Sequence, residues 1–168
     1  NALTGLHQHT GNWPGKTVAT AAGTCSIDAA AVELIDLPGT YSLSARSPEE
    51  EVAAEYISFG CADAVIVVCD ATALERNLYL ALQVMEITDH VVICVNLMDE
   101  AEKRGITVDL PRLSQMLGVR VVGTSARQKK TLPPLLRAAV AAAQERHRKP
   151  VPVRYGEAIE AGRFSIEA

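Results

Sequence analysis

Short apolar runs of strand length, each closed by a polar residue, constrain the fold of this chain more than any other feature. The runs cover residues 31–35, 64–69, 91–95 and 119–122, interrupted only by Glu33 and Arg120; Asp36, Asp70 and Asn96 follow three of them directly, and Ser125 lies just beyond the fourth. Helical patterns lie between or after them, as at 74–87 and 132–148. Buried strands that alternate with helices predict a doubly wound α/β fold, with a mostly parallel sheet covered on both faces. Ligands bind such sheets at the carboxyl ends of the strands, so the polar residues should collect along one edge.

Local signals predict where several elements begin and end. Ser47 precedes Pro48 and lies three residues before Glu50, which is typical of a helix start, and Gly60 should end that helix. Asp109 should cap a shorter helix that closes at Gly118. Residues 18–27 and 31–35 could pair through a turn near Asp28. Residues 7–18 are rich in glycine, proline and polar side chains, and a long loop is expected there.

Composition bounds the class of protein. The chain has 168 residues, of which 48% are hydrophobic and 21% charged, so one domain with a substantial core is expected. The net charge of −4 argues against a nucleic-acid surface. The apolar runs are too short and broken to span a membrane. None of the four cysteines forms a C-x-x-C pair, and buried free thiols in a reducing compartment are predicted.

The stretch D-L-P-G at 36–39 has the features of a magnesium–phosphate site. Asp36 directly follows an apolar strand, and its carboxylate can hold Mg²⁺ through water. Gly39 lacks a Cβ, so its backbone N–H can come close to a phosphate oxygen. Leu37 and Pro38 complete the turn. Taken alone, D-x-x-G is common in ordinary turns.

Two further stretches could recognise a purine base. Asn96 and Asp99 follow a buried strand, and a carboxylate there can accept from the ring N–H and exocyclic amine of guanine. Leu97 and Met98 lie between them. Backbone N–H groups of the next strand end, at 124–126, could meet the guanine carbonyl oxygen, and Ser125 could brace the Asp99 loop. A polar turn before the next helix is the alternative interpretation.

The loop at 11–18 supplies a threonine upstream of Asp36. The hydroxyl of Thr17 can bind Mg²⁺ and its backbone N–H can bind a γ-phosphate, and hydrolysis would release the loop. An ordinary Gly/Pro loop is the alternative. A threonine loop, then D-x-x-G, then N-x-x-D, then T-S-A, each at a strand end, is the order of elements in a GTPase.

Longer motifs make the resemblance specific. G-N-W-P-G-K-T-V at 11–18, D-L-P-G-T-Y-S-L at 36–43, D-A-T-A-L-E-R-N-L at 70–78 and N-L-M-D at 96–99 resemble the cytosolic G domain of the bacterial ferrous iron transport protein B (FeoB) family. The resemblance runs from Asn1 to about Arg148. It implies a G domain over 1–149, followed by a linker and the start of an appended helical domain over 150–168.

The resemblance implies a slow GTPase on the cytoplasmic face of the bacterial inner membrane. Its ligands would be GTP or GDP with Mg²⁺, with K⁺ left open. Its partner would be the membrane transport region of the same polypeptide, with small accessory iron-transport proteins and a homo-oligomer left open. Catalytic roles are expected at Thr17, Gly39 and Thr40, and metal binding at Thr17 and Asp36. The nucleotide-binding positions are expected to be Gly15, Lys16, Thr17, Val18, Ala19, Asp36, Leu37, Pro38, Gly39, Asn96, Leu97, Met98, Asp99, Thr124, Ser125 and Ala126.

The sequence departs from GTPases in three places. No G-x-x-x-x-G-K-[ST] loop occurs, so the natural protein is expected to extend upstream of Asn1, and this stretch alone is expected to be inactive. Leu97 stands where many GTPases have lysine, which predicts modest nucleotide affinity. Thr40 follows Gly39 where fast GTPases use a glutamine that orients water, so a weak intrinsic rate is expected; Thr40 could equally be a turn residue.

Three other functions remain as alternatives. The first is a nucleotide-free regulatory or interaction module, in which the phosphate-binding loop would be truly absent. A ribosome-associated GTPase of the same superfamily would want a basic appended domain. A receiver-type signalling domain would want an acidic cluster near the chain start, and none is present.

Overall fold

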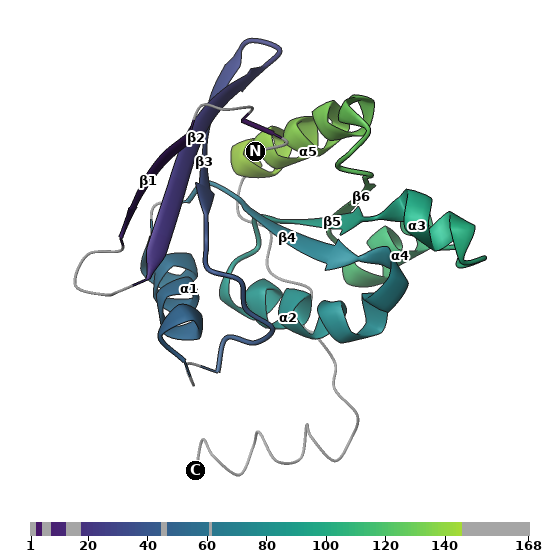
Figure 1. Cartoon of the computed structure of the whole chain (residues 1–168), viewed down its shortest axis with the longest axis horizontal. Coiled ribbons are helices and arrows are strands. Elements are labelled where there is room, and N and C mark those ends of the chain that lie inside the picture. The colour runs from purple at the N-terminus through teal and green to yellow at the C-terminus, as the bar shows by residue number, and fades with distance from the viewer. Residues whose placement is uncertain (1–2, 5–7, 13–17, 45–46, 61, 146–168) are drawn as a thin grey trace.

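The computed structural model describes residues 3–4, 8–12, 18–44, 47–60 and 62–145 of the chain. Figure 1 shows a parallel sheet with helices on both faces and a long antiparallel hairpin beside it. The strands are β1 Gln8–Asn12, β2 Ala19–Ile27, β3 Ala30–Asp36, β4 Val65–Asp70, β5 Val91–Asn96 and β6 Arg120–Gly123. The α-helices are α1 Pro48–Phe59, α2 Leu74–Ile87, α3 Met98–Lys103, α4 Leu110–Leu117 and α5 Leu132–Gln144, with short 3₁₀ turns η1 Ala71–Ala73 and η2 Lys129–Thr131.

The strands form two three-stranded groups among the described residues. β4, β5 and β6 are parallel in that order, and Asp70 pairs with Asn96 at the last rung of β4 and β5. β1, β2 and β3 are antiparallel, and β2 and β3 are joined by the turn at Asp28. The predicted α/β class is confirmed, and the expected pairing through Asp28 is present.

The turn at Asp28 is tied to the last helix. Asp28 has a positive φ of 54°, which is tolerated best by glycine, asparagine and aspartate. Its carboxylate accepts two hydrogen bonds from Arg137 of α5, with Nε to Oδ2 at 2.9 Å. Hydrogen bonding to this guanidinium lowers the pKa of Asp28. The Asp28–Arg137 ion pair therefore ties the tip of the β2–β3 hairpin to α5, and Figure 1 shows the hairpin rising beside that helix.

One prediction about the first residues is wrong. Residues 7–18 were expected to form a loop, but Gln8–Asn12 is strand β1, paired with β2 from Gln8↔Gly23 to Asn12↔Ala19. Glycine and polar residues are poor strand formers in isolation. Pairing with the long strand β2 overrides that preference, because a ladder supplies the backbone hydrogen bonds that a loop would leave to water.

The helix ends behave as their sequences predict. The Ser47 hydroxyl accepts from the Glu50 N–H at 3.2 Å, and the Gly60 N–H donates to the Tyr56 carbonyl. Asp109 caps α4 by accepting from Arg112 N–H at 3.0 Å, and Gly118 closes it with φ 71°. The long last helix is described to Gln144; the predicted end near Arg148 and the segment 150–168 lie outside the described residues.

Apolar side chains cover both faces of the parallel sheet. On one face Val67, Ile93 and Val95 pack with α2 residues Ala81 and Val84. On the other, Val92 and Cys94 of β5 pack with Leu135 and Ala142 of α5. Residues of β5 alternate between the two faces, as strand geometry requires. The central strand is thus buried along most of its length, and only its carboxyl end carries polar side chains.

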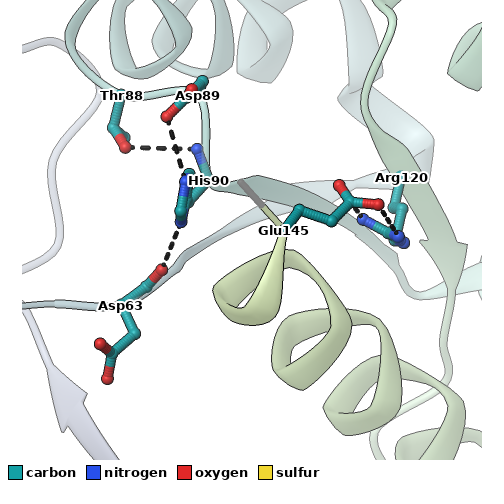
Figure 2. Close-up of polar contacts among 6 residues, drawn as sticks. All are labelled: Asp63, Thr88, Asp89, His90, Arg120 and Glu145. Carbon is teal, nitrogen blue, oxygen red and sulfur yellow. Dashed lines mark hydrogen bonds and ion pairs between the residues drawn. The ribbon is translucent and has the colours of Figure 1, made fainter. Parts of the chain in front are cut away.

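The amino-terminal edge of this sheet is closed by polar contacts (Figure 2). His90 Nδ1 donates to the Asp63 carbonyl at 2.9 Å, just before β4, while Val65 N–H donates to the His90 carbonyl. Arg120 at the start of β6 makes two hydrogen bonds to Glu145, at 2.9 and 2.6 Å. These contacts hold α5 and the loops at the amino-terminal edge. A ligand site is expected at the opposite, carboxyl edge of the sheet.

Within the described ranges, no helix combines the length and apolar character needed to cross a bilayer.

Candidate functional site

The carboxyl edge of the parallel sheet carries two adjoining loops from β5 and β6. The first, 96–99, follows β5 and contains Asn96 and Asp99. The second, 124–126, follows β6. The sequence predicted that these loops meet, and the structure brings them together through hydrogen bonds, although 25 or more residues separate the partners in the chain.

The Asn96 carboxamide is held at its oxygen. Oδ1 accepts from the Thr124 hydroxyl and from the Ala126 backbone N–H, each at 3.1 Å. Because the N–H of Ala126 can only donate, the atom that faces it must be the amide oxygen. The Nδ2 group of Asn96 therefore points away from these two partners.

The Asp99 loop is held by Ser125. The Ser125 hydroxyl accepts from the Asp99 backbone N–H at 3.1 Å, and Ser125 itself is 4% exposed. Hydrogen bonding with the Ser125 hydroxyl is the largest cause that lowers the pKa of the Asp99 carboxyl. Asp99 is therefore a carboxylate at neutral pH, an acceptor that faces solvent and is available to a donor-rich ligand.

Backbone geometry presents this acceptor. Leu97 has a positive φ of 62°, rare for a residue with a branched side chain, and its carbonyl accepts from the N–H groups of Glu100 and Ala101. The chain thereby turns into α3, a short helix that the sequence did not reveal. Met98 N–H donates to the Thr124 carbonyl at 3.1 Å, and its side chain packs in the core. Strained φ values of this kind persist where the surroundings enforce them, often at ligand sites.

The N–H groups of 124–126 all have acceptors within the protein. Thr124 donates to the Val95 carbonyl, Ser125 to the Thr131 hydroxyl and Ala126 to Asn96. Thr124 and Ser125 are buried, and Ala126 is half-buried. The loop at 124–126 therefore positions Asn96 and Asp99. Of its three residues only Ala126 is not buried, so its N–H is the one that a ligand oxygen could share. Thr131 was not predicted, because nothing in the sequence marks a threonine that far along the chain as part of the loop.

Asp36 ends β3 and is exposed. Leu37 and Pro38 are half-buried, and Gly39 is exposed. A Cβ placed on Gly39 would meet no described protein atom within 4 Å, so packing does not demand glycine there. Within the described part of the chain, no group of three metal-binding side chains gathers around Asp36 or elsewhere.

The segment after Gly39 rests on α2. Leu43 N–H donates to Gln83 Oε1 at 2.9 Å, the Leu43 side chain packs against the core, and the Arg76 guanidinium lies 5.5 Å from the Tyr41 ring centre. Arg76 and Gln83 are two helical turns apart and so share one face of α2. Thr40 makes a local turn in which its hydroxyl donates to the Ser42 carbonyl and accepts from the Ser42 N–H.

Other predicted positions lie in β2 or outside the described residues. Val18, directly before β2, is 7% exposed, and Ala19 is the first residue of β2. Gly15, Lys16 and Thr17 fall outside the described residues, so the roles predicted for them stay predictions. Asp70, the other polar strand end, caps η1 by accepting from the Thr72 N–H and hydroxyl at 2.7 and 2.8 Å.

Removing the Gln83 side-chain amide should loosen the segment that carries Gly39. In Gln83→Ala the Leu43 N–H loses its acceptor, and hydrogen exchange of that amide should accelerate by about fivefold, the equivalent of one net hydrogen bond. Exchange measured on the peptide covering 40–44 tests this. Gln115→Ala, on the surface of α4, is the control and should leave that peptide unchanged. Equal exchange in the two variants would contradict the assignment.

A parallel sheet with helices on both faces and an amide–carboxylate loop pair at its carboxyl edge defines an α/β protein of the G-domain class. The chain belongs to the FeoB family: the model of ferrous iron transport protein B matches residues 1–139.

Relatives and solved structures agree with this assignment. A Porphyromonas gingivalis protein described as an Fe(2+) transport protein A/Fe(2+) transporter FeoB fusion is 43% identical over 163 residues, 95% of this chain and 19% of its own length. The Fe(2+) transporter FeoB of Escherichia coli is 45% identical over 126 residues, 73% of this chain and 16% of its own. The chain thus spans less than a fifth of these curated relatives.

The solved structures match this chain over a larger share of their own length. The cytosolic domain of the T. maritima FeoB iron transporter in a GDP form superposes with a TM-score of 0.91 and 38% identity, over 99% of this chain and 66% of that one. The G domain of the same protein gives a TM-score of 0.80 and 40% identity, over 86% and 88%. The predicted family is therefore confirmed.

Proposed function

We propose that the chain forms a GTP-binding and slowly GTP-hydrolysing domain that regulates a ferrous iron transporter at the cytoplasmic face of the bacterial inner membrane. The observation that carries the proposal is the pair Asn96 and Asp99, held in place by 124–126. Related structures of the T. maritima FeoB cytosolic domain in GDP and GMPPNP forms support nucleotide binding.

In this proposal guanine binds at the β5–β6 end of the site. The Asp99 carboxylate accepts from the ring N–H and the exocyclic amine of the base. Asn96 Nδ2 donates to an acceptor on its edge, and the Ala126 N–H is shared with the guanine carbonyl oxygen. An adenine base lacks the ring N–H that the carboxylate needs, so it is rejected. A charged acceptor left without its donors is costly, which makes the selection strong.

The phosphates and Mg²⁺ bind toward β3 in this proposal. Asp36 holds Mg²⁺ through water, Gly39 donates to the γ-phosphate, and Thr17 contacts both. The metal neutralises the charge that builds up on the phosphates. The contacts of Tyr41 and Leu43 with α2 link the Gly39 segment to the rest of the domain. Loss of the γ-phosphate would release that segment and signal to the membrane region of the same polypeptide.

Release of phosphate from GTP, but not from ATP, by the complete protein is the direct test of the proposed activity. Slow, Mg²⁺-dependent release from GTP is expected, because no glutamine follows Gly39 to orient water. Equal rates with ATP would contradict the proposal.

Asp36→Asn should raise the Mg²⁺ requirement. The substitution removes the negative charge but keeps the shape, so the Mg²⁺ concentration for half-maximal GTP hydrolysis should rise by about tenfold or more. Binding of GDP measured without Mg²⁺ should not change. Glu33→Gln, an exposed carboxylate on the same strand, is the control. An unchanged Mg²⁺ requirement in Asp36→Asn would remove Asp36 from the metal site.

A further inference from the structure

A buried thiol stands behind the asparagine of the proposed base site. Cys94 lies on β5, two residues before Asn96, and is 3% exposed. Its Sγ is 3.2 Å from the hydroxyl of Thr124, which is 2% exposed. That hydroxyl is in turn 3.1 Å from Asn96 Oδ1. The three side chains form a continuous line from the core to the edge of the sheet.

The direction of each hydrogen bond in this line follows from the donors available. Asn96 Oδ1 faces the Ala126 N–H, so it is the amide oxygen and can only accept. The Thr124 hydroxyl must therefore give its single proton to Oδ1. Since that proton is used, the contact with Cys94 requires the thiol to donate to the Thr124 oxygen. The line thus runs one way, from the Cys94 S–H through the Thr124 O–H to Asn96.

We propose that Cys94 is a positioning residue for base recognition, acting through Thr124 to hold the Asn96 carboxamide with its Nδ2 group toward the ligand. This inference rests on the proposed function. The thiol occupies one lone pair of the Thr124 oxygen, so the hydroxyl proton stays aimed at Oδ1. Without that donor the hydroxyl can rotate away from Oδ1, which leaves the carboxamide held by the Ala126 N–H alone.

The surroundings make the line rigid. Cys94 packs with Val92, Leu135 and Ala142 between the sheet and α5, and is only 3% exposed to solvent. Burial raises the pKa of the Cys94 thiol, which keeps the proton on sulfur at neutral pH. In such low-dielectric surroundings an unpaired hydroxyl lone pair is unfavourable, so the thiol donor matters more than it would in water.

Cys69 offers a matched control. It is a second buried free cysteine, 0% exposed, on the neighbouring strand β4. Its side chain belongs to the apolar cluster on the opposite face of the sheet, with Val67 and Val95. Cys69→Ala therefore removes a buried thiol of the same size without touching the line to Asn96.

The test compares GDP dissociation constants of the complete protein and its variants. Cys94→Ala should weaken GDP binding by about threefold to tenfold, the range for one lost hydrogen bond between neutral groups. Cys94→Ser, which keeps a donor, and Cys69→Ala should each stay within about twofold of the wild type. IDP binding should weaken by the same factor as GDP binding in Cys94→Ala, because the missing exocyclic amine faces Asp99 and not Asn96.

Asn96→Ala separates the possible outcomes. If Asn96→Ala weakens GDP binding but Cys94→Ala behaves like Cys69→Ala, the positioning role is overturned while the base site stands. If Cys94→Ser loses as much affinity as Cys94→Ala, the thiol acts through packing, and the role is again overturned. If Asn96→Ala leaves GDP binding unchanged, the proposed base site fails and the positioning role fails with it.

Discussion

Replacing Asp99 with asparagine is expected to change the base preference of the site from guanine to xanthine. The carboxylate accepts from two donors of guanine, whereas an asparagine amide presents a donor to the ring position that carries the exocyclic amine. Losing a charge-assisted pair and leaving donors unpaired should weaken GDP binding by about 100-fold or more. Xanthine has a carbonyl at that position, so XDP should bind the variant better than GDP does.

Competition of GDP and XDP for the complete protein measures this change. Glu100→Gln is the matched control, because Glu100 is the next carboxylate in the chain and pairs with Lys103 on the surface of α3 at 3.0 Å. It should leave GDP binding within about twofold of the wild type, as expected for an exposed ion pair. If Asp99→Asn kept the guanine preference, Asp99 would not read the base.

Replacing Ile93 with alanine is expected to cause the largest loss of stability. Ile93 is 0% exposed and lies in the middle of the central strand, between Val67 of β4 and Val121 of β6. Truncating a fully buried isoleucine costs about 3 kcal/mol, because apolar contacts are lost and a cavity remains. Since β5 carries both the Asn96 loop and Cys94, the site depends on this strand.

Hydrogen exchange of the β5 amides in the complete protein tests that expectation. A loss of about 3 kcal/mol in the free energy of unfolding corresponds to about 100-fold faster exchange at those amides that exchange only when the core opens. Ile106→Ala, at a position 39% exposed, is the control and should change the exchange of β5 little. Similar exchange in both variants would mean that Ile93 does not anchor the sheet.

The parallel part of the fold could be predicted because its signals are local. The apolar runs before Asp70 and Asn96 are strands, and the periodic stretch between them is helix α2, Leu74–Ile87, with the predicted bounds. The central strand β5 is buried on both faces, so its burial appears directly as a continuous apolar run, whereas Val68 of β4 is 61% exposed. The caps at Ser47 and Asp109 are also local, since each side chain bonds an N–H three residues away.

The remaining elements depend on tertiary contacts that a local pattern does not contain. β1 forms because β2 offers it a partner, and its own residues are not typical of a strand. Helix α3 begins after Leu97, whose positive φ no apolar pattern indicates.

The candidate site also has one part that the sequence could predict and one part that it could not. The meeting of Asn96 and Asp99 with the loop at 124–126 could be predicted, because parallel strand ends share an edge of the sheet. The side chains that support the site from within the fold could not be predicted. In sequence, Cys94 resembles any core residue and Gln83 resembles any polar residue on a helix. Their contacts span 30 and 40 residues of sequence, so only the folded chain reveals them.

Calorimetric titration of the complete protein with GDP, IDP and ADP tests the central claim most directly. The account predicts that GDP binds, that IDP binds more weakly because it lacks the amine facing Asp99, and that ADP gives no measurable heat of binding. Equal affinities for GDP and ADP would contradict it, because the loops at 96–99 and 124–126 would then not select a guanine base.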